Sequence, residues 1–253
     1  MLQQTQVSRA ETAWTSLLVD LPTPAAAAAA GQAELVRRWE GLGYNRRAVG
    51  LHRAAVVIVD RHRGAVPDDL DELLALPGVG PYTARAVLAF AFERDVAVVD
   101  TNVARIISRA VTGAPLSAPV LQRVADALVG EGDGWRHNQA MLDHGALVCT
   151  ARGPACDGCA LRRSCAWRRA GAENPDPSRT TAGTSRPQAR FEGSVRQARG
   201  AVLDVLRRGP AGPPEVDRLR QRLGVDRVDR ALATLVAEGL IEWSAGRMVL
   251  SGG

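Results

Sequence analysis

The sequence predicts an all-α fold for its first two thirds, and three observations support this prediction. Apolar residues recur at helical spacing through residues 1–169. The hydrophobic content of 46% consists mainly of Leu, Val and Ala, with only three Phe and two Tyr, and this composition favours helices. Only Val96 to Val99 has the pattern of a strand, and this segment is too short to build a sheet.

Individual helices follow from the spacing of apolar residues and from the positions of proline. Because Pro is tolerated in the first turn of a helix, Thr23-Pro24 and Ser117-Ala118-Pro119 mark helix starts. The apolar spacing predicts helices over Ala33 to Trp39, Ala48 to Arg61, Pro81 to Phe92, Asn102 to Ala110 and Pro119 to Val129.

The last third of the chain has a different composition. Residues 170–190 are rich in Pro, Ser, Thr and Gly with almost no large apolar side chain, so we expect a flexible linker. Residues 191–253 predict three helices and a short hairpin around Ala245-Gly246, the pattern of a winged-helix-like domain; a small helical bundle without DNA function is the alternative. These elements are Gly193 to Arg208, Pro214 to Leu223, Val228 to Glu238, Leu240 to Trp243 and Arg247 to Leu250.

The charge of the chain fits a polyanionic partner. Its net charge is +5 and its sequence pI is about 9.6. Every cationic side chain is Arg, so no Lys amine is available for Schiff-base chemistry. No apolar run reaches the ~18 residues of a membrane-spanning helix, and the start MLQQTQV lacks the regions of a signal peptide. We expect a cytoplasmic, nucleoid-associated protein without a membrane partner.

All four cysteines lie in one short segment with the spacing C-x6-C-x2-C-x5-C: Cys149, Cys156, Cys159 and Cys165. Four thiolates gathered in one loop suit a soft metal, either tetrahedral zinc or an iron-sulfur cluster. Two disulfides are the alternative. Zinc sites usually contain two close cysteine pairs, whereas only the middle pair is close here, so the spacing favours a 4Fe-4S cluster.

The segment Leu76-Pro-Gly-Val-Gly-Pro-Tyr-Thr-Ala84 predicts a tight turn between two helices. Gly78 and Gly80, on either side of Val79, let the backbone approach a ligand, and Pro81 begins the second helix. Unpaired N–H groups at such a helix start bind phosphate, although a turn of this kind is often only a turn. Asp100 follows at the start of the next predicted helix, where it is either an N-cap or a functional carboxylate.

With these motifs in this order, the chain resembles the helix-hairpin-helix base-excision DNA glycosylases of the cluster-bearing branch, and among them the adenine (MutY-type) glycosylases. The resemblance covers residues 1–169 and implies a two-lobed helix-hairpin-helix fold with a 4Fe-4S loop. The segments that carry it, besides the turn and the cysteines, are Met1 to Val7, Trp39 to Tyr44, Val99-Asp100, Asn102-Val103 and Asn138-Gln139-Ala140.

The resemblance implies monofunctional hydrolysis of the N-glycosidic bond of adenine mispaired with 8-oxoguanine or guanine. Asp100 stabilises the positive charge on the deoxyribose, and Asn102 and Tyr82 steady the site. At the position of Tyr82, the related endonuclease III type has a Lys that cleaves the strand. An endonuclease III-like or thymine mismatch glycosylase and a catalytically impaired DNA-binding protein are the alternatives.

Further residues resemble DNA contacts of that family. Gln4 matches a residue that wedges into the base stack, and Tyr44 matches a second intercalating side chain. Thr5 and Leu42 match residues that contact the base opposite the adenine. Leu2 and Gln139 match the adenine pocket, with core packing as the alternative for Leu2 and Leu42. Arg152 belongs to a basic patch that suits phosphates, or to a solvated face; the other members are Arg162, Arg163, Arg168 and Arg169.

Two features depart from the family pattern. The family's general acid is a Glu two residues before the Met of the MLQQT segment, and here that Met is residue 1. We expect a start codon assigned too far downstream, the alternative being a genuine truncation with impaired activity. In addition, residues 191–253 are too short and too helical for the Nudix-like domain that reads 8-oxoguanine. The expected partner of this monomer is double-stranded DNA with a mismatched or oxidised base pair.

Overall fold

The computed structural model describes residues 1, 5, 7–172, 175–184 and 190–252, and these are mostly helical. The helices of the first half are α1 (Val7–Asp20), α2 (Pro24–Ala29), α3 (Gln32–Arg38), α4 (Arg46–His62), α5 (Leu70–Ala75), α6 (Pro81–Ala91) and α7 (Thr101–Ile106). The π-helix η1 (Ile107–Thr112) and the helices α8 (Ala118–Asp126), α9 (Gly134–Leu147), η2 (Cys156–Gly158), α10 (Ala166–Arg169) and η3 (Pro177–Arg179) follow. The last elements are α11 (Val195–Arg208), α12 (Pro213–Leu223), α13 (Val225–Ala237), β1 (Ile241–Ser244) and β2 (Arg247–Leu250).

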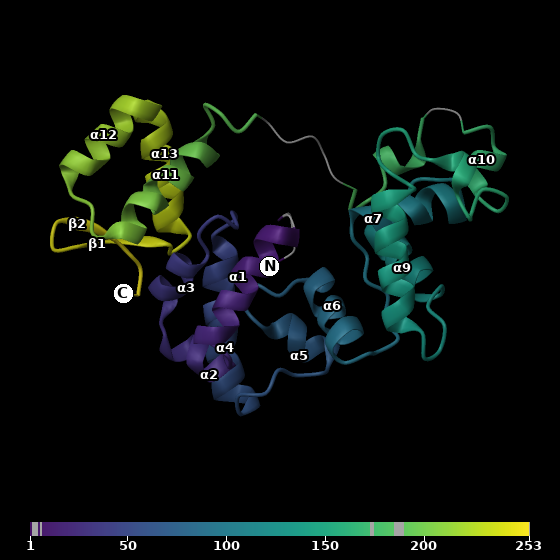
Figure 1. Cartoon of the computed structure of the whole chain (residues 1–253), viewed down its shortest axis with the longest axis horizontal. Coiled ribbons are helices and arrows are strands. Elements are labelled where there is room, and N and C mark those ends of the chain that lie inside the picture. Colours follow the sequence, from purple (N-terminus) through teal and green to yellow (C-terminus); the bar gives the residue numbers. More distant parts are fainter. Residues whose placement is uncertain (2–4, 6, 173–174, 185–189, 253) are drawn as a thin grey trace. The chain divides into compact units, whose positions relative to one another are not determined.

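The chain forms two compact units, and unit 1 combines its two ends. Unit 1 contains residues 1–67, 75–79 and 188–253. One core joins Leu35 and Val36 of α3 and Val49 of α4 to Leu203 of α11 and Leu235 of α13. Figure 1 shows α3 beside the β1–β2 hairpin. The expected boundary at 190 lies close to the start of the last segment of unit 1, whereas the one at 169 falls inside unit 2. Residues 191–253 share a unit with residues 1–67, because the C-terminal helices bury their apolar faces on α3 and α4.

The C-terminal elements have the order expected from the sequence. Strands β1 and β2 pair antiparallel, with Ser244 opposite Arg247. Ala245 (φ 48°) and Gly246 (φ 74°) both adopt left-handed conformations, as the tight turn of a two-residue hairpin requires. Ala211, between α11 and α12, forms an isolated antiparallel bridge to Met248. This bridge adds a short third partner to the hairpin.

Unit 2 contains residues 68–74 and 80–187, and its helices surround the cysteine loop. The strand expected at Val96 to Val99 is absent from the described residues. The side chain of Asn138 in α9 supplies the hydrogen bonds that a strand partner would supply: its Oδ1 accepts from Val98 N at 2.7 Å, and its Nδ2 donates to Val96 O at 2.8 Å. A polar side chain therefore keeps this segment extended outside a sheet.

Helix boundaries in unit 2 differ from the expected ones at two places. The helix predicted over Asn102 to Ala110 begins at Thr101 and changes to a π-helix after Ile106. The helix predicted to reach Val129 ends at Asp126. Apolar spacing does not distinguish an α-turn from a π-turn, and π-segments are frequent at functional sites.

Part of the predicted linker is packed rather than loose. Asp176 and Thr181 are 7% and 4% exposed. Ala182 N donates to Leu116 O at 2.9 Å, and Leu116 N donates to Thr181 Oγ1 at 3.2 Å. The segment is ordered by hydrogen bonds and an ion pair, so its lack of large apolar side chains did not reveal its packing. No helix in the described part of the chain is long and apolar enough to cross a membrane.

Candidate functional site

The turn between α5 and α6 requires glycine at one of its two glycine positions. Gly78 has a φ of +80°, and a Cβ added there would lie 2.9 Å from the Cα of Gly50 in α4. Val79 N donates to Leu76 O at 3.1 Å and closes the turn. By contrast, Gly80 has a φ of −103°, and a Cβ added there would meet nothing within 4 Å. Gly80 therefore leaves open space at the N-terminus of α6, where Pro81 is in the first turn.

Tyr82 and Asp100 lie close enough to influence each other electrostatically. Burial raises the pKa of the Tyr82 hydroxyl, and the negative charge of Asp100 raises it further. The hydroxyl therefore remains protonated and can act as a hydrogen-bond donor at neutral pH. The structure brings together two of the residues that the sequence places in the catalytic site.

The carboxylate of Asp100 is fixed by the start of α7. Its Oδ1 accepts hydrogen bonds from the backbone N–H groups of Asn102 at 2.7 Å and Val103 at 2.8 Å, and its Oδ2 accepts from Asn102 Nδ2 at 3.0 Å. Asp100 is thus an N-cap, as the structural alternative predicted, and it remains only half-buried. Capping fixes the direction of the carboxylate and leaves part of it accessible.

A chain of hydrogen bonds runs from Asp100 to the first cysteine. Asn102 donates to Asp100, and Asn102 Oδ1 accepts from Arg105 Nη2 at 2.7 Å. Arg105 Nε donates to the carbonyl oxygen of Cys149 at 2.6 Å, and its Nη2 also donates to Gly145 O at 2.6 Å. A Cβ at Gly145 would lie 2.5 Å from the Cβ of Asn102, so this glycine allows α7 and α9 to pack closely.

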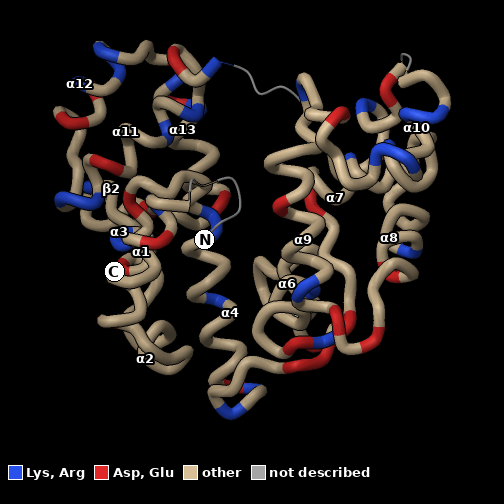
Figure 2. The backbone as a smooth tube through the Cα atoms, turned by 45° about the vertical axis from the view of Figure 1, so that its right-hand side comes forward, with Lys and Arg blue, Asp and Glu red and all other residues tan. Residues whose placement is uncertain are grey.

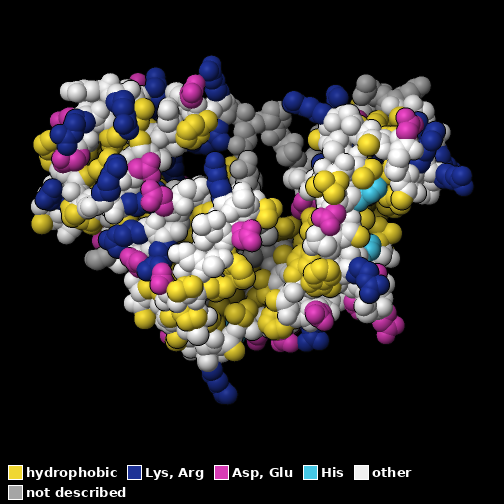
Figure 3. Space-filling view, in the orientation of Figure 1, with side chains coloured by type: hydrophobic (Ala, Val, Ile, Leu, Met, Phe, Trp, Pro, Cys, Tyr) yellow, Lys and Arg dark blue, Asp and Glu magenta, His cyan; other side chains and the backbone are white. Residues whose placement is uncertain are grey.

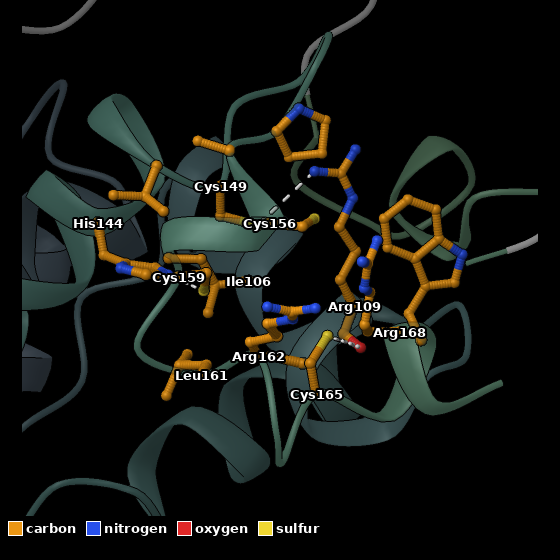
Figure 4. Close-up of a pocket in the computed structure, with 15 residues that line it drawn as sticks. Ile106, Arg109, His144, Cys149, Cys156, Cys159, Leu161, Arg162, Cys165 and Arg168 are labelled. Carbon is orange, nitrogen blue, oxygen red and sulfur yellow. Dashed lines mark hydrogen bonds between the residues drawn. The ribbon is translucent and has the colours of Figure 1, made fainter. Parts of the chain in front are cut away.

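The four cysteines line one pocket and are all free thiols (Figure 4). The disulfide alternative is therefore not realised. Within the described residues, no group of three or more His, Cys, Asp or Glu side chains is placed to hold a single metal ion. The thiols are spread around the pocket, and Ile106, Leu161 and Trp167 also line it. This donor set consists of soft sulfur ligands in an apolar surrounding.

Two side chains donate towards the cysteine sulfurs or contact them. Arg109 Nη1 lies 3.6 Å from Cys149 Sγ, and His144 Nε2 lies 3.5 Å from Cys159 Sγ. The guanidinium of Arg109 stacks 5.0 Å from the ring centroid of Trp167. Hydrogen bonds to cysteine sulfur are a means by which proteins tune metal-bound thiolates.

Arg109 is buried, and a carboxylate from the predicted linker neutralises it. The Arg109 and Asp176 side chains are 2% and 9% exposed, and Arg109 Nη2 lies 2.5 Å from Asp176 Oδ2. Burial alone would lower the pKa of Arg109, but its hydrogen bonds to Asp176 and Cys149 outweigh burial and raise it. The ion pair attaches residues 176–178 to η1 beside the cysteine pocket.

Basic and acidic side chains of unit 2 gather at opposite ends of the unit (Figure 2). Exposed arginines surround α10 and the cysteine loop: Arg152, Arg162, Arg163 and Arg169. Arg168 is half-buried and pairs with Asp157 at 3.2 Å. Acidic side chains gather at the other end, where Asp95 accepts from the backbone of Gly132 and Gly134. A polyanion would therefore approach the end that carries the cysteines.

The proposed DNA-contacting residues of unit 1 lie in and near the loop between α3 and α4. Tyr44 is 48% exposed, whereas Leu42 is only 4% exposed and packs in the core. Thr5 Oγ1 donates to Leu42 O at 3.1 Å. Leu2 and Gln4 lie outside the described residues, and Gln139 in α9 donates to Asp143 at 3.0 Å. The side chain of Leu42 therefore packs in the core, which was the alternative to a DNA contact at this position.

Sequence reasoning missed four polar residues of the cysteine region: Arg105, Arg109, His144 and Asp176. The two arginines share one face of a helix with apolar residues, at the spacing i, i+4, and buried arginine at such positions is a signal of a required partner. Asp176 had no comparable signal, because its segment has the composition of a linker.

Comparisons with known proteins agree with these observations. The model of the HhH-GPD superfamily base excision DNA repair proteins matches residues 1–116. An adenine DNA glycosylase of Mycolicibacterium smegmatis is 46% identical over 258 residues, which cover 100% of this chain and 85% of the relative. An adenine DNA glycosylase of Mycobacterium tuberculosis is 42% identical, over 100% of this chain and 83% of the relative. The human adenine DNA glycosylase is 37% identical over 66% of this chain and 32% of its own length.

Solved structures show the same fold. A thermostable thymine-DNA glycosylase superimposes with a TM-score of 0.62 at 26% identity, over 67% of this chain and 80% of that protein. A trapped endonuclease III–DNA covalent intermediate superimposes with a TM-score of 0.61 at 25% identity, over 68% of this chain and 82% of that protein. The chain belongs to the adenine DNA glycosylases of the HhH-GPD superfamily of base excision DNA repair proteins.

Proposed function

We propose that the chain removes adenine mispaired with 8-oxoguanine or guanine from double-stranded DNA, by hydrolysis and without cutting the strand. The observation that carries this proposal is the 46% identity over the whole chain to an adenine DNA glycosylase. In this chain the carboxylate of Asp100 is held at the start of α7. Excision of thymine is less favoured, because the thymine-DNA glycosylase structure is only 26% identical.

Asp100 has the geometry that this chemistry needs. Loss of the base builds positive charge on the deoxyribose, and a fixed carboxylate stabilises that charge without reorganising. Asn102 orients the carboxylate through its own side chain, and Tyr82 offers a protonated hydroxyl near it. Water then forms the new bond to C1′ and gives up one proton. Adenine leaves with the electrons of the N-glycosidic bond and takes up one proton, so that it departs as a neutral base. The chain contains no Lys, so a Lys Schiff base is not part of this route.

Contacts to DNA would come from several elements. The turn formed by Gly78, Val79 and Gly80 would bring backbone N–H groups at the start of α6 to a phosphate, with open space at Gly80 and with the Val79 N–H engaged in closing the turn. Arg152 and its exposed neighbours would contact the backbone. Tyr44 is exposed and could stack between bases. The loop that carries it is held by the hydrogen bond from Thr5 to the backbone of Leu42. Gln4, Leu2 and Gln139 are assigned to the base stack and the adenine pocket by their motif positions.

Cys149, Cys156, Cys159 and Cys165 are proposed as the ligands of a 4Fe-4S cluster. The residues fit this group because four thiols are spread around an apolar pocket instead of converging on one ion. When bound, the cluster would supply a rigid centre for the basic loop, and the neighbouring arginines would then face DNA. Iron and acid-labile sulfide in anaerobically purified protein would support this assignment, and stoichiometric zinc without iron would refute it.

Three further assignments complete the proposal. Residues 191–253 form a winged-helix-like domain, supported by the order of α11 to β2 and by the Ala211–Met248 bridge. We expect the protein to act as a monomer. We also expect it to work at the nucleoid in the cytoplasm, where its mispaired or oxidised DNA substrate lies.

The decisive experiment is an excision assay. Duplexes with adenine opposite 8-oxoguanine, guanine or thymine are incubated with the chain and with a version extended upstream in frame, and alkali reveals abasic sites. We expect excision opposite 8-oxoguanine and guanine, and its loss by a factor of about 10² or more in Asp100→Asn. Asp68→Asn is the matched control, because Asp68 is an exposed carboxylate of the same unit that pairs with Arg94. Excision by neither protein, or full activity in Asp100→Asn, would overturn the proposal.

A further inference from the structure

The loop between α3 and α4, residues 39–45, has a strained backbone. Gly41, Gly43 and Tyr44 have φ values of 77°, 68° and 46°. Tyr44 is the non-glycine among them, and the left-handed conformation costs such a residue about 1–2 kcal/mol. Conformations of this kind persist when the surroundings hold them in place. The contacts that surround the loop therefore determine the backbone conformation of Tyr44 and the direction of its side chain.

Side chains at the two ends of the loop, Trp39 and Arg47, hold its middle. Arg47 Nη2 donates to Leu42 O at 3.0 Å and to Gly43 O at 3.3 Å. Trp39 Nε1 also donates to Gly43 O, at 3.0 Å. The guanidinium of Arg47 lies 5.2 Å from the ring centroid of Trp39 and 5.9 Å from that of Tyr44. These contacts fix the carbonyl groups of the loop, and Arg47 N donates to Tyr44 O at 2.9 Å where the loop joins α4.

The C-terminal segment adds a side-chain contact at this junction. Arg207 of α11 donates from Nη2 to Asn45 Oδ1 at 2.7 Å and from Nε to Val36 O at 3.3 Å. Its Nη1 donates to Asp204 at 2.7 Å, and its side chain is 8% exposed. Asn45 is the N-cap of α4, yet its side chain makes no capping hydrogen bond. The backbone of Asn45 is helical (φ −57°, ψ −19°) and not extended as in an ordinary capping residue, and its side chain binds Arg207.

The surface of the C-terminal segment does not suggest a separate DNA-binding platform. Several of its cations pair with neighbouring acids, as in Arg199–Glu238 at 2.6 Å and Arg220–Asp229 at 2.7 Å. Figure 3 shows cationic and acidic side chains interspersed on its visible face. The contact that distinguishes this segment is its hydrogen bond to the loop that carries Tyr44.

We propose that Arg207 is a positioning residue through which the C-terminal segment sets the preference for mispaired DNA. By holding Asn45, it fixes the direction in which Tyr44 leaves the loop. A segment without a Nudix-like fold thereby contributes to recognition of the base opposite adenine. This inference rests on the proposed function, since it assigns the loop to DNA recognition.

The test compares Arg207→Ala, Asn45→Ala and the double variant in the full chain. Arg208→Ala is the matched control, because Arg208 is exposed on the same helix. Affinity is measured for duplexes with 2′-fluoro-2′-deoxyadenosine, which resists cleavage, opposite 8-oxoguanine, guanine or thymine. Hydrogen exchange of residues 36–47 and of 100–147 is followed in parallel, and thermal unfolding reports on global stability.

We expect Arg207→Ala to reduce the affinity ratio between the 8-oxoguanine and thymine duplexes by about three- to tenfold, the range of coupling carried by indirect contacts. Asn45→Ala should give the same loss, the double variant no more than either, and Arg208→Ala none. Exchange should rise in residues 36–47 alone.

An unchanged ratio in Arg207→Ala, or an equal loss of affinity for all duplexes, overturns the inference while the wild-type protein still discriminates. A wild-type protein that neither discriminates nor excises adenine refutes the proposed function instead. In that case the exchange measurement still decides whether Arg207 holds the loop, because unchanged exchange in residues 36–47 overturns the bracing itself.

Discussion

The two units of the chain are stabilised by different means. In unit 1, one apolar core joins α3 and α4 to α11, α13 and the hairpin, and Leu35, Leu203 and Leu235 are fully buried in it. In unit 2, the core around Val103 and Ile107 joins mainly small residues. Its cysteine region is instead held by buried arginines, and Arg105 and Arg109 are 6% and 2% exposed.

This difference has a consequence for how each unit responds to mutation. Apolar cores lose stability in proportion to the volume removed and tolerate partial repacking. Buried charges fail abruptly, because removing one partner leaves the other without compensation in a medium of low dielectric constant. We therefore expect unit 2 to be the more fragile unit, and the predictions below compare the two from the largest effect to the smallest.

The largest effect is expected for Arg109→Met. The substitution leaves the carboxylate of Asp176 buried without its cation, and breaking such a pair costs about 3–5 kcal/mol. The loss of stability is measured by urea unfolding at pH 7 with hydrogen exchange as the probe. Exchange should rise in α7 of unit 2 and stay unchanged in α11 of unit 1. Iron content should fall as well, since Arg109 also contacts Cys149.

Two variants control this prediction. Arg168→Met removes an ion pair to Asp157, which is 86% exposed, and should cost less than about 1 kcal/mol. Arg109→Met with Asp176→Leu removes both charges and should recover much of the loss. A double variant as unstable as Arg109→Met would show that the cation matters for a reason other than its pairing.

Leu203→Ala tests the core of unit 1 and is expected to cost about 2–5 kcal/mol. Because Leu203 shares its core with α3 and α4, hydrogen exchange should rise in these helices as well as in α11 to α13. Iron content should not change. Exchange that rises only after residue 190 would instead indicate an independent C-terminal domain.

Gly78→Ala and Gly80→Ala form a matched pair in the turn between α5 and α6. The first introduces a Cβ 2.9 Å from Gly50 Cα at a φ of +80°, and the left-handed conformation and overpacking together should cost about 2 kcal/mol or more. The second enters open space and should cost less than about 0.5 kcal/mol. Gly80→Ala should nevertheless weaken DNA binding, because its methyl group would occupy the space offered to a phosphate. Equal stability losses in thermal unfolding would contradict this distinction.

Much of the fold could be predicted because it follows from local rules. Thr23-Pro24 marks the start of α2, and the Thr23 hydroxyl accepts from Ala26 N at 3.1 Å, as an N-cap should. Ala245-Gly246 marks the hairpin turn for the same kind of reason. The shared core of unit 1 could not be predicted, because an apolar helix face indicates burial but not the partner helix.

The candidate site was predictable to a different extent. Asp100 and the cysteines were predicted from their residue types and order, and Tyr82 was assigned through the family resemblance. In the structure the negative charge of Asp100 acts on the Tyr82 hydroxyl. Asp176 was not found, since a single carboxylate in a segment rich in Pro and Ser has no local signature of burial. Long-range polar pairs of this kind depend on tertiary packing, which one sequence does not encode in any short window.

The smallest effect is expected for the pH dependence of a partly exposed carboxylate in unit 1. Glu215 Oε2 accepts from Gly212 N at 2.8 Å at the start of α12, and this hydrogen bond lowers the pKa of Glu215 below its ordinary value of 4.5. A carboxyl group with a lowered pKa contributes stability above its unfolded value and loses it as the pH falls through the folded value. Glu215→Gln keeps an acceptor but cannot titrate, so the wild-type advantage over this variant should be present at pH 7 and should be lost as the pH falls below 4.5 and through the lowered pKa of the folded protein. Urea midpoints of both proteins, followed through exchange in α12, measure this. A constant difference across the pH range would show that shape, and not charge, makes Glu215 stabilising, and unit 1 would then contain no electrostatic contribution at this helix start.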